Sequence, residues 1–200
     1  MTLPNKLTLL RILVIPAMII LACIPYLNDN YIFLQLTYAN FINVILFCLA
    51  SMTDFLDGYI ARKYNLVTTF GKFADPLADK MLVLISFMIL MVQPNLVADF
   101  NSVALQVVPM WAVAIILLRE LIVSGVRLVA AQRGEVIAAG WSGKVKTFET
   151  MIALIFLFLS GLNNIIAIIG LILLYISVVL TIYSGFEYVY KSRKIIFESI

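Results

Sequence analysis

The sequence predicts an all-α membrane protein with six transmembrane helices, on three observations. Of its 200 residues, 64% are hydrophobic and only 12% are charged, which is far from the composition of soluble domains. Long apolar runs alternate with short polar segments, and the basic residues gather at alternate ends of those runs. Each bilayer crossing uses about 20 apolar residues, so six crossings account for nearly the whole chain. We therefore expect one membrane domain over residues 1–200, surrounded by membrane lipids.

The apolar runs give the positions of the six spans. They are expected at about 8–26, 37–62, 73–97, 105–131, 147–161 and 165–190. The first run lacks a small-residue cleavage site, so it is interpreted as a retained span and not as a signal peptide. The fifth run is short for a full crossing, so the helices are expected to differ in how far they extend across the bilayer.

The basic residues predict the orientation of these spans. All 14 lysines and arginines fall in four segments at alternate span ends, namely 6–11, 62–80, 119–146 and 191–194. The opposite connections contain no lysine or arginine. Positively charged loops stay in the cytoplasm, so both termini and the charged loops are expected there, in a bacterial-type inner membrane. No nucleic-acid partner is expected.

The residue types restrict the chemistry that the chain can carry out. Histidine is absent, which removes the usual neutral-pH base and the commonest transition-metal ligand. The two cysteines, Cys23 and Cys48, lie inside apolar runs and are interpreted as packing residues. Acid-base or metal chemistry must therefore depend on carboxylates.

Four aspartates stand at the membrane edge on two consecutive predicted helices: Asp54, Asp57, Asp75 and Asp79. Steps of three and four residues return to the same helix face, so each helix presents its pair on one side. The short connection between the helices allows both pairs to converge. Four carboxylates in a partly dehydrated site need bound cations to remain ionised. Oxygen ligands alone favour hard ions, so we expect Mg²⁺ or Mn²⁺, with room for two ions. The alternative is that these acids form helix caps and interfacial ion pairs with neighbouring lysines and arginines.

The segment reads D-x-x-D-G-x-x-A-R-x8-G-x-x-x-D-x-x-x-D, which resembles the signature of the CDP-alcohol phosphatidyltransferase family at every position. The resemblance implies that Asp54, Asp57 and Asp75 bind metal and that Asp79 is both a metal ligand and the catalytic base. It also implies contacts to the cytidine nucleotide and its lipid from the conserved-pattern positions Gly58, Ala61, Arg62 and Gly71.

Polar residues near the N-terminus share one helix face with three-residue spacing. Asn5, Thr8 and Arg11 follow Pro4 in this pattern. They are expected either to cover the nucleotide or to anchor the first helix at the membrane surface.

A second group of charges belongs to the fourth span and the segment after it. Arg119 lies about 24 Å along its predicted helix, at a rise of 1.5 Å per residue, and so within the hydrocarbon zone. One interpretation is a structural ion pair with Glu120 or an aspartate. The other is a pocket for the phosphate of an anionic acceptor, formed by Arg119, Arg127, Lys144 and Lys146.

The accessory motifs around these residues are similar to those of the bacterial branch of the family that synthesises phosphatidylglycerol phosphate. That resemblance implies CDP-diacylglycerol and glycerol 3-phosphate as substrates, CMP as a product, and a homodimer. The same chemistry with inositol phosphate, serine or phosphatidylglycerol as acceptor remains an alternative. An alternative from another class is a cation transporter lined by carboxylates.

Overall fold

The computed structural model describes residues 3–64, 68–93, 97–100, 103–132 and 140–193, and most of them are helical. The helices are α1 (Leu3–Cys23), α2 (Pro25–Asp29), α3 (Tyr38–Lys63), α4 (Thr69–Val92), α5 (Met110–Gln132), α6 (Trp141–Phe158) and α7 (Asn164–Lys191), with a 3-10 turn η1 (Ser160–Leu162). The strands are β1 (Tyr31–Phe33), β2 (Leu36–Thr37), β3 (Val97–Phe100) and β4 (Val103–Gln106).

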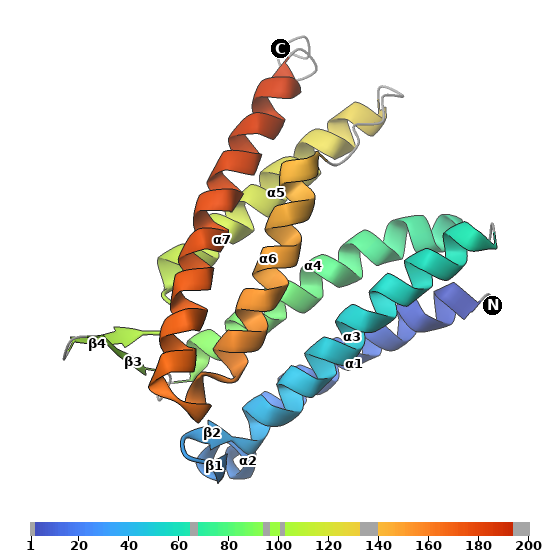
Figure 1. The fold of residues 1–200 in the computed structure, drawn as a ribbon. Coiled ribbons are helices and arrows are strands. Elements are labelled where there is room, and N and C mark those ends of the chain that lie inside the picture. Colours follow the sequence, from blue (N-terminus) through green and yellow to red (C-terminus); the bar gives the residue numbers. More distant parts are fainter. Residues whose placement is uncertain (1–2, 65–67, 94–96, 101–102, 133–139, 194–200) are drawn as a thin grey trace.

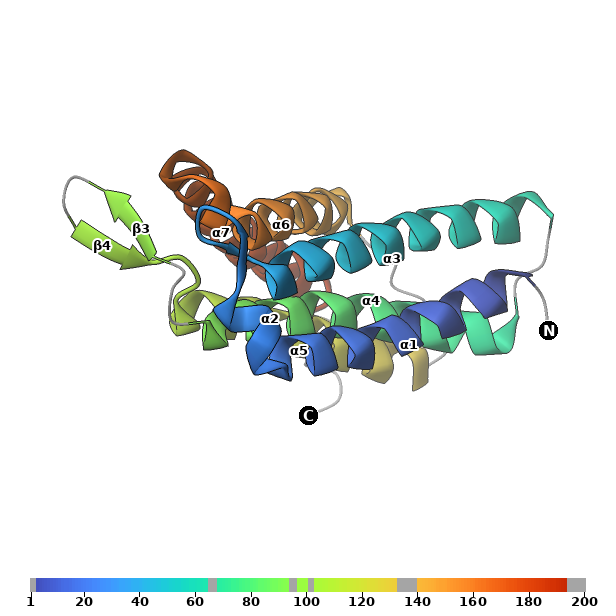
Figure 2. The same cartoon turned by 90° about the horizontal axis from the view of Figure 1, so that it is seen from below.

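The long helices form two groups that meet at one end of the molecule and diverge at the other (Figure 1). In the first group α1 packs against α3 and α4, and in the second α7 packs against α5 and α6. The two groups touch where α6 contacts α3 and α4, and where α4 contacts α5. Viewed from below, α1 runs along both α3 and α4, and α4 continues toward α5 (Figure 2). Helix α4 therefore belongs to the first group and also faces the second.

The six long helices follow the predicted spans with shifts of a few residues. The largest shift is in the fifth, where α6 begins at Trp141 instead of 147 and so is longer than expected. Four helical segments are long and apolar enough to cross a membrane in the described part of the chain: Asn5–Cys23, Tyr38–Gly58, Trp141–Leu162 and Asn164–Lys191. Helices α4 and α5 are of similar length, but charged residues lie near their middles, at Asp79 and Lys80 in α4 and at Arg119 and Glu120 in α5.

The prediction of a purely helical chain missed two short antiparallel hairpins. Strand β1 pairs with β2, and β3 pairs with β4 in the register Val97 to Gln106 and Phe100 to Val103. Both hairpins lie at the end where the helix groups meet, opposite the two termini (Figure 1). The first lies in a predicted connection, and the second also includes residues at the ends of the spans predicted at 73–97 and 105–131. Strands of two to four residues leave no long periodic pattern that would reveal them.

Polar contacts close the end of the molecule that carries the hairpins. The amides of Asn40 on α3 and Gln93 after α4 bond reciprocally at 2.6 and 2.8 Å. Thr37 caps α3 by accepting a hydrogen bond from the Asn40 backbone N–H at 3.2 Å. The backbone N–H of Gln35 donates to the Gly161 carbonyl at 3.0 Å, which joins the β1–β2 hairpin to η1. The first contacts tie together elements of the first helix group, and the last joins that group to the second at this end.

The apolar residues divide between an interior and an outer surface. Phe47, Phe87 and Phe158 are fully buried at 0 to 1% exposure, and Phe47 and Phe158 lie 6.3 Å apart between ring centroids. Large apolar side chains such as Leu13 and Phe186 remain exposed along the helices. A lipid environment makes such outer faces favourable, whereas contiguous apolar surface on this scale is rare on soluble monomers.

Gly161 is expected to tolerate no side chain. A Cβ atom there would lie 2.5 Å from the Gln35 carbonyl oxygen, which is backbone and cannot turn away. Gly161→Ala should therefore destabilise the fold by about 1–3 kcal/mol or more, seen as a lower thermal midpoint in detergent. Gly125→Ala on α5 is the matched control, since nothing lies within 4 Å of its Cβ position, and it should keep or raise the midpoint. Equal midpoints for the two variants would contradict this explanation.

Candidate active site

The structure brings together the two aspartate pairs that the sequence places on separate helices. Asp54 and Asp57 lie near the end of α3, and Asp75 and Asp79 lie in the first half of α4. Both helices pack against α1, which supplies the residue between them. We call these four side chains the carboxylate centre. It lies toward the diverging end of the molecule, away from the hairpins.

The guanidinium of Arg11 lies within the carboxylate centre. Its Nη1 lies 2.8 Å from Asp54 Oδ1 and 3.0 Å from Asp79 Oδ1, and its Nη2 lies 2.7 Å from Asp57 Oδ2. The Arg11 side chain is fully buried, and its Nε has no hydrogen-bond partner. One internal cation thus pairs with three of the four aspartates. The expectation of nucleotide contact by Arg11 stays a prediction, but its position in this structure is among the acids.

The fourth aspartate is held by the same face of α1. The Thr8 hydroxyl donates to Asp75 Oδ1 at 2.7 Å, and the Thr68 hydroxyl donates to Asn5 Oδ1 at 2.7 Å. A Cβ at Gly71 would lie 3.5 Å from Asp75 Oδ2 and 3.6 Å from Asn5 Oδ1. Glycine at position 71 therefore keeps the space beside Asp75 free.

The other predicted nucleotide contacts lie on α3. Gly58 follows Asp57 directly and is partly exposed. Ala61 and Arg62 lie on the next turn of the same helix. The structure does not describe their side chains, so their predicted contacts stay predictions.

The carboxylate centre has the donors that hard divalent ions require. Three carboxylates already converge on a single cationic group, so their oxygens can share a cation, and every donor is a hard oxygen. Within the described residues, the structure shows no group of three acidic, histidine or cysteine side chains arranged to hold a metal ion. Arg11 accounts for this, because it occupies the region between the acids. The donor types suit a hard divalent ion, and in this structure Arg11 holds the position between them.

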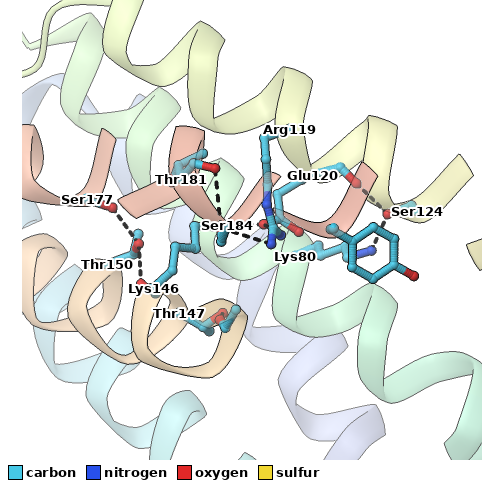
Figure 3. A network of polar contacts seen from close by, with 12 residues as sticks. Lys80, Arg119, Glu120, Ser124, Lys146, Thr147, Thr150, Ser177, Thr181 and Ser184 are labelled. Carbon is cyan, nitrogen blue, oxygen red and sulfur yellow. Dashed lines mark hydrogen bonds and ion pairs between the residues drawn. The ribbon is translucent and has the colours of Figure 1, made fainter. Parts of the chain in front are cut away.

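A second polar site contains three cations and one acid (Figure 3). Glu120 Oε1 lies 3.0 Å from Arg119 Nη1 and 2.7 Å from Lys146 Nζ. Arg119 Nη2 also donates to Ser184 Oγ at 3.1 Å. Lys80 of α4 donates to Ser124 on α5. We call Lys80, Arg119 and Lys146 the cation cluster.

Two of the four cations predicted to bind acceptor phosphate lie outside this cluster. Arg127 stacks on the Tyr188 ring at 5.5 Å, and its Nε is 3.4 Å from the Tyr188 hydroxyl. Lys144 is exposed, whereas Lys146, two positions further on α6, is buried. Residues two apart on a helix face different directions, which explains the separation.

The sequence analysis missed Lys80 as part of this site, whereas the structure confirms Glu120 as a partner of Arg119. The sequence pattern includes Lys80 only among the lysines and arginines that could pair with the aspartates. The available signal was its position directly after Asp79, since neighbouring helix residues point about 100° apart. Asp79 thus faces Arg11 on α1 while Lys80 faces Ser124 on α5.

The fold is typical of a membrane protein, and its two polar sites are formed by carboxylates and cations. The model of the CDP-alcohol phosphatidyltransferase family matches residues 1–183, and the chain belongs to this family of transferases. It is 41% identical over 198 residues to the CDP-diacylglycerol–glycerol-3-phosphate 3-phosphatidyltransferase of Bacillus subtilis, covering 95% of this chain and 94% of that one. The protein of the same name from Rickettsia typhi is 40% identical, with 98% of both chains covered. That of Salmonella choleraesuis is 33% identical, with 95% and 94% covered. Membership of a transferase family favours the enzyme interpretation over the transporter.

Proposed function

We propose that this protein transfers the phosphatidyl group from CDP-diacylglycerol to glycerol 3-phosphate, producing phosphatidylglycerol phosphate and CMP. The observation that carries the proposal is the convergence of three aspartates of the family signature on one cation position, with Asp75 held next to them by Thr8 and a cluster of three cations nearby. The names of the relatives, which cover nearly the whole chain, support the choice of both substrates.

The carboxylate centre is the proposed donor site. Asp54, Asp57, Asp75 and Asp79 would hold Mg²⁺ or Mn²⁺, two ions in all. When bound, such ions neutralise a diphosphate and stabilise the charge that develops on its oxygens. Asn5, Thr8, Arg11, Gly58, Ala61, Arg62 and Gly71 are the proposed contacts to the nucleotide and its lipid. Arg11 in particular can offer its planar guanidinium to phosphate oxygens when it leaves the aspartates.

Asp79 is the proposed general base. It takes the proton from the acceptor hydroxyl, the resulting oxygen attacks the lipid-bearing phosphorus, and the bond from that phosphorus to CMP breaks. A carboxylate is a weak base for an alcohol, so the hydroxyl must be acidified by its surroundings. Arg11 lies 3.0 Å from Asp79 Oδ1 in this structure, and its positive charge disfavours protonation of this carboxylate until the two groups separate.

The cation cluster is the proposed site for the acceptor phosphate. Arg119 offers a bidentate fork and Lys146 a compact charge, and both already bind one carboxylate oxygen. The contacts of Arg127 and Lys144 give no support to a shared pocket with these two residues, so their role in the acceptor site stays a prediction.

The proposed membrane arrangement has six spans within a single domain and both termini on the cytoplasmic side of a bacterial inner membrane. The positions of the charged segments support it, and so does the placement of both hairpins at the end opposite the termini (Figure 1). The site at the diverging end would then face the cytoplasm, where nucleotide and glycerol 3-phosphate are soluble. We also propose a homodimer.

The proposed function is tested by CMP release from the purified protein in detergent. With CDP-diacylglycerol and Mg²⁺ or Mn²⁺, release is expected with glycerol 3-phosphate and not with inositol phosphate, serine or phosphatidylglycerol. Chelation of the metal should abolish it. Asp75→Ala should also abolish it, whereas Asp29→Ala, the same change at an exposed position on α2, should retain it. Turnover with another acceptor alone would overturn the choice of glycerol 3-phosphate.

A further inference from the structure

Glu120 is the acid among the cations of the second site, and its carboxylate binds two of them with one oxygen. Oε1 accepts from Lys146 Nζ at 2.7 Å and from Arg119 Nη1 at 3.0 Å. A phosphate oxygen bound to a lysine and an arginine makes the same two charge-assisted contacts at the same distances. The carboxylate therefore has the position and the hydrogen bonds that an anionic ligand would have.

The exposures of the three side chains indicate which of them can move. The side chain of Lys146 is 4% exposed and that of Arg119 is 14% exposed, whereas that of Glu120 is 25% exposed. Ser184 also holds Arg119 through Nη2 at 3.1 Å. The cations are thus fixed by their surroundings, and the acid is the most accessible member of the group.

Lys80 adds a third cation from a helix of the other group. Its Nζ donates to the Ser124 hydroxyl, which in turn donates to the backbone carbonyl of Glu120 at 2.5 Å. The chain of contacts runs from α4 to α5 beside the Glu120 side chain (Figure 3). Lys80 therefore contributes charge close to the position of the carboxylate without an ion pair of its own among the described residues.

The charges around Glu120 do not balance. Lys80, Arg119 and Lys146 are three cations, and Glu120 is the single carboxylate that pairs with any of them. Glu149, one turn beyond Lys146, forms no ion pair within the described residues. Glu149 acts on Lys146 only from beyond ion-pair distance, so the cations outnumber the carboxylates in direct contact with them, inside a membrane protein where unpaired charge is costly. A phosphate monoester dianion has the charge that complements this excess.

We infer that Glu120 is an internal stand-in for the phosphate of the acceptor. It holds Arg119 and Lys146 in place when no acceptor is bound, and it gives up both contacts when a phosphate monoester dianion enters. Lys80 is the third cation that the phosphate meets. This inference rests on the proposed function and adds to it the means by which phosphorylated acceptors are selected.

Selection follows from the exchange of one anion for another. An uncharged alcohol offers nothing that compensates Arg119 and Lys146 for the loss of the Glu120 carboxylate. A phosphate replaces the lost contacts with stronger ones and neutralises the excess charge. Glycerol should therefore fail to enter the site, while inorganic phosphate should enter it without the rest of the substrate.

The test compares wild-type protein with Glu120→Gln, using inorganic phosphate and glycerol 3-phosphate as ligands and glycerol as the uncharged probe. Thermal midpoints in detergent report binding, and initial rates of CMP release report KM and kcat. Loss of the competing carboxylate should tighten phosphate binding and lower KM for glycerol 3-phosphate, on the order of tenfold if the empty site is mostly closed by Glu120. The ligand-free midpoint of this variant should fall, because the cations lose their counter-ion.

Two variants serve as comparisons. Glu187→Gln removes a carboxylate that pairs with Lys191 at 2.5 Å and contacts neither Arg119 nor Lys146, so it should leave phosphate binding unchanged. Glu120→Asp should fold if Glu120→Gln does not. Its shorter carboxylate pairs less well with the two cations, so phosphate binding should also tighten.

Weaker or unchanged phosphate binding in Glu120→Gln would overturn the inference. If Glu120 only positions the cations, its loss should raise KM for glycerol 3-phosphate. Stabilisation of the wild-type protein by glycerol as strongly as by phosphate would also overturn it. If the proposed function is wrong, wild-type protein will release no CMP with glycerol 3-phosphate. Binding of inorganic phosphate needs no turnover, so it tests the role of Glu120 separately.

Discussion

Replacing Arg11 by glutamine is expected to destabilise the metal-free protein strongly. Arg11 is the buried cation that pairs with Asp54, Asp57 and Asp79 at 2.7 to 3.0 Å. Removing one partner of a buried ion pair costs about 3–5 kcal/mol, which corresponds to a fall of roughly 6–20 °C in the thermal midpoint of a chain of this size. The measurement is thermal unfolding in detergent with a metal chelator present.

Divalent metal is expected to reverse most of this loss. Metal ions and Arg11 compete for the same carboxylate oxygens, so the glutamine variant should gain more stability from Mn²⁺ than the wild type gains, and should bind Mn²⁺ more tightly. Arg193→Gln is the control, because Arg193 is exposed and stacks on Tyr190 at 4.6 Å, away from the acids. An unchanged midpoint for Arg11→Gln in chelator would show that the ion pairs contribute little to stability.

Replacing Asp79 by asparagine is expected to reduce turnover by about 10²–10⁴-fold, the usual contribution of a general base. Asparagine keeps the size of the side chain but cannot take up the proton of the acceptor hydroxyl. Binding of CDP-diacylglycerol should largely persist, because Asp54, Asp57 and Asp75 remain. CMP release measures the first effect, and stabilisation by the CDP-lipid in the presence of Mg²⁺ measures the second.

The same substitution at a distant aspartate gives the comparison for Asp79. Asp29→Asn changes an exposed residue of α2 at the opposite end of the molecule and should leave the rate unchanged. If Asp79→Asn retains more than about a tenth of wild-type activity, the residue is not the base.

Helix periodicity was sufficient to predict the convergence of the four aspartates. Their spacing within α3 and within α4 places each pair on one face, and the short connection brings the faces together. The need for a compensating cation also followed from the sequence. Its identity in this structure did not, because Arg11 is more than 40 residues away in the chain, and only the packing of α1 against both helices puts it between the acids.

The second site was predicted in part for a similar reason. Arg119 and Glu120 are neighbours in sequence, so their pairing was a natural interpretation. Lys80 and Ser184 lie near Arg119 because α4 and α7 pack against α5. The periodicity of a single helix does not predict which other helices pack against it. The two hairpins were missed because their strands are too short to show alternation.

The division of contacts around α4 has a consequence for how proteins of this architecture can diversify. Residues of α1, α3 and the Asp75–Asp79 face of α4 form the carboxylate centre, while the cation cluster draws on α5, α6 and Lys80. If the two sites have their proposed roles, substitutions on α5 to α7 should alter acceptor preference while the carboxylate centre keeps its geometry. The register of α4, which turns consecutive residues 79 and 80 toward different halves, is the constraint that both halves share. An insertion there would rotate one set of groups away from the other, so variation should accumulate in α5 to α7 and spare the length of α4.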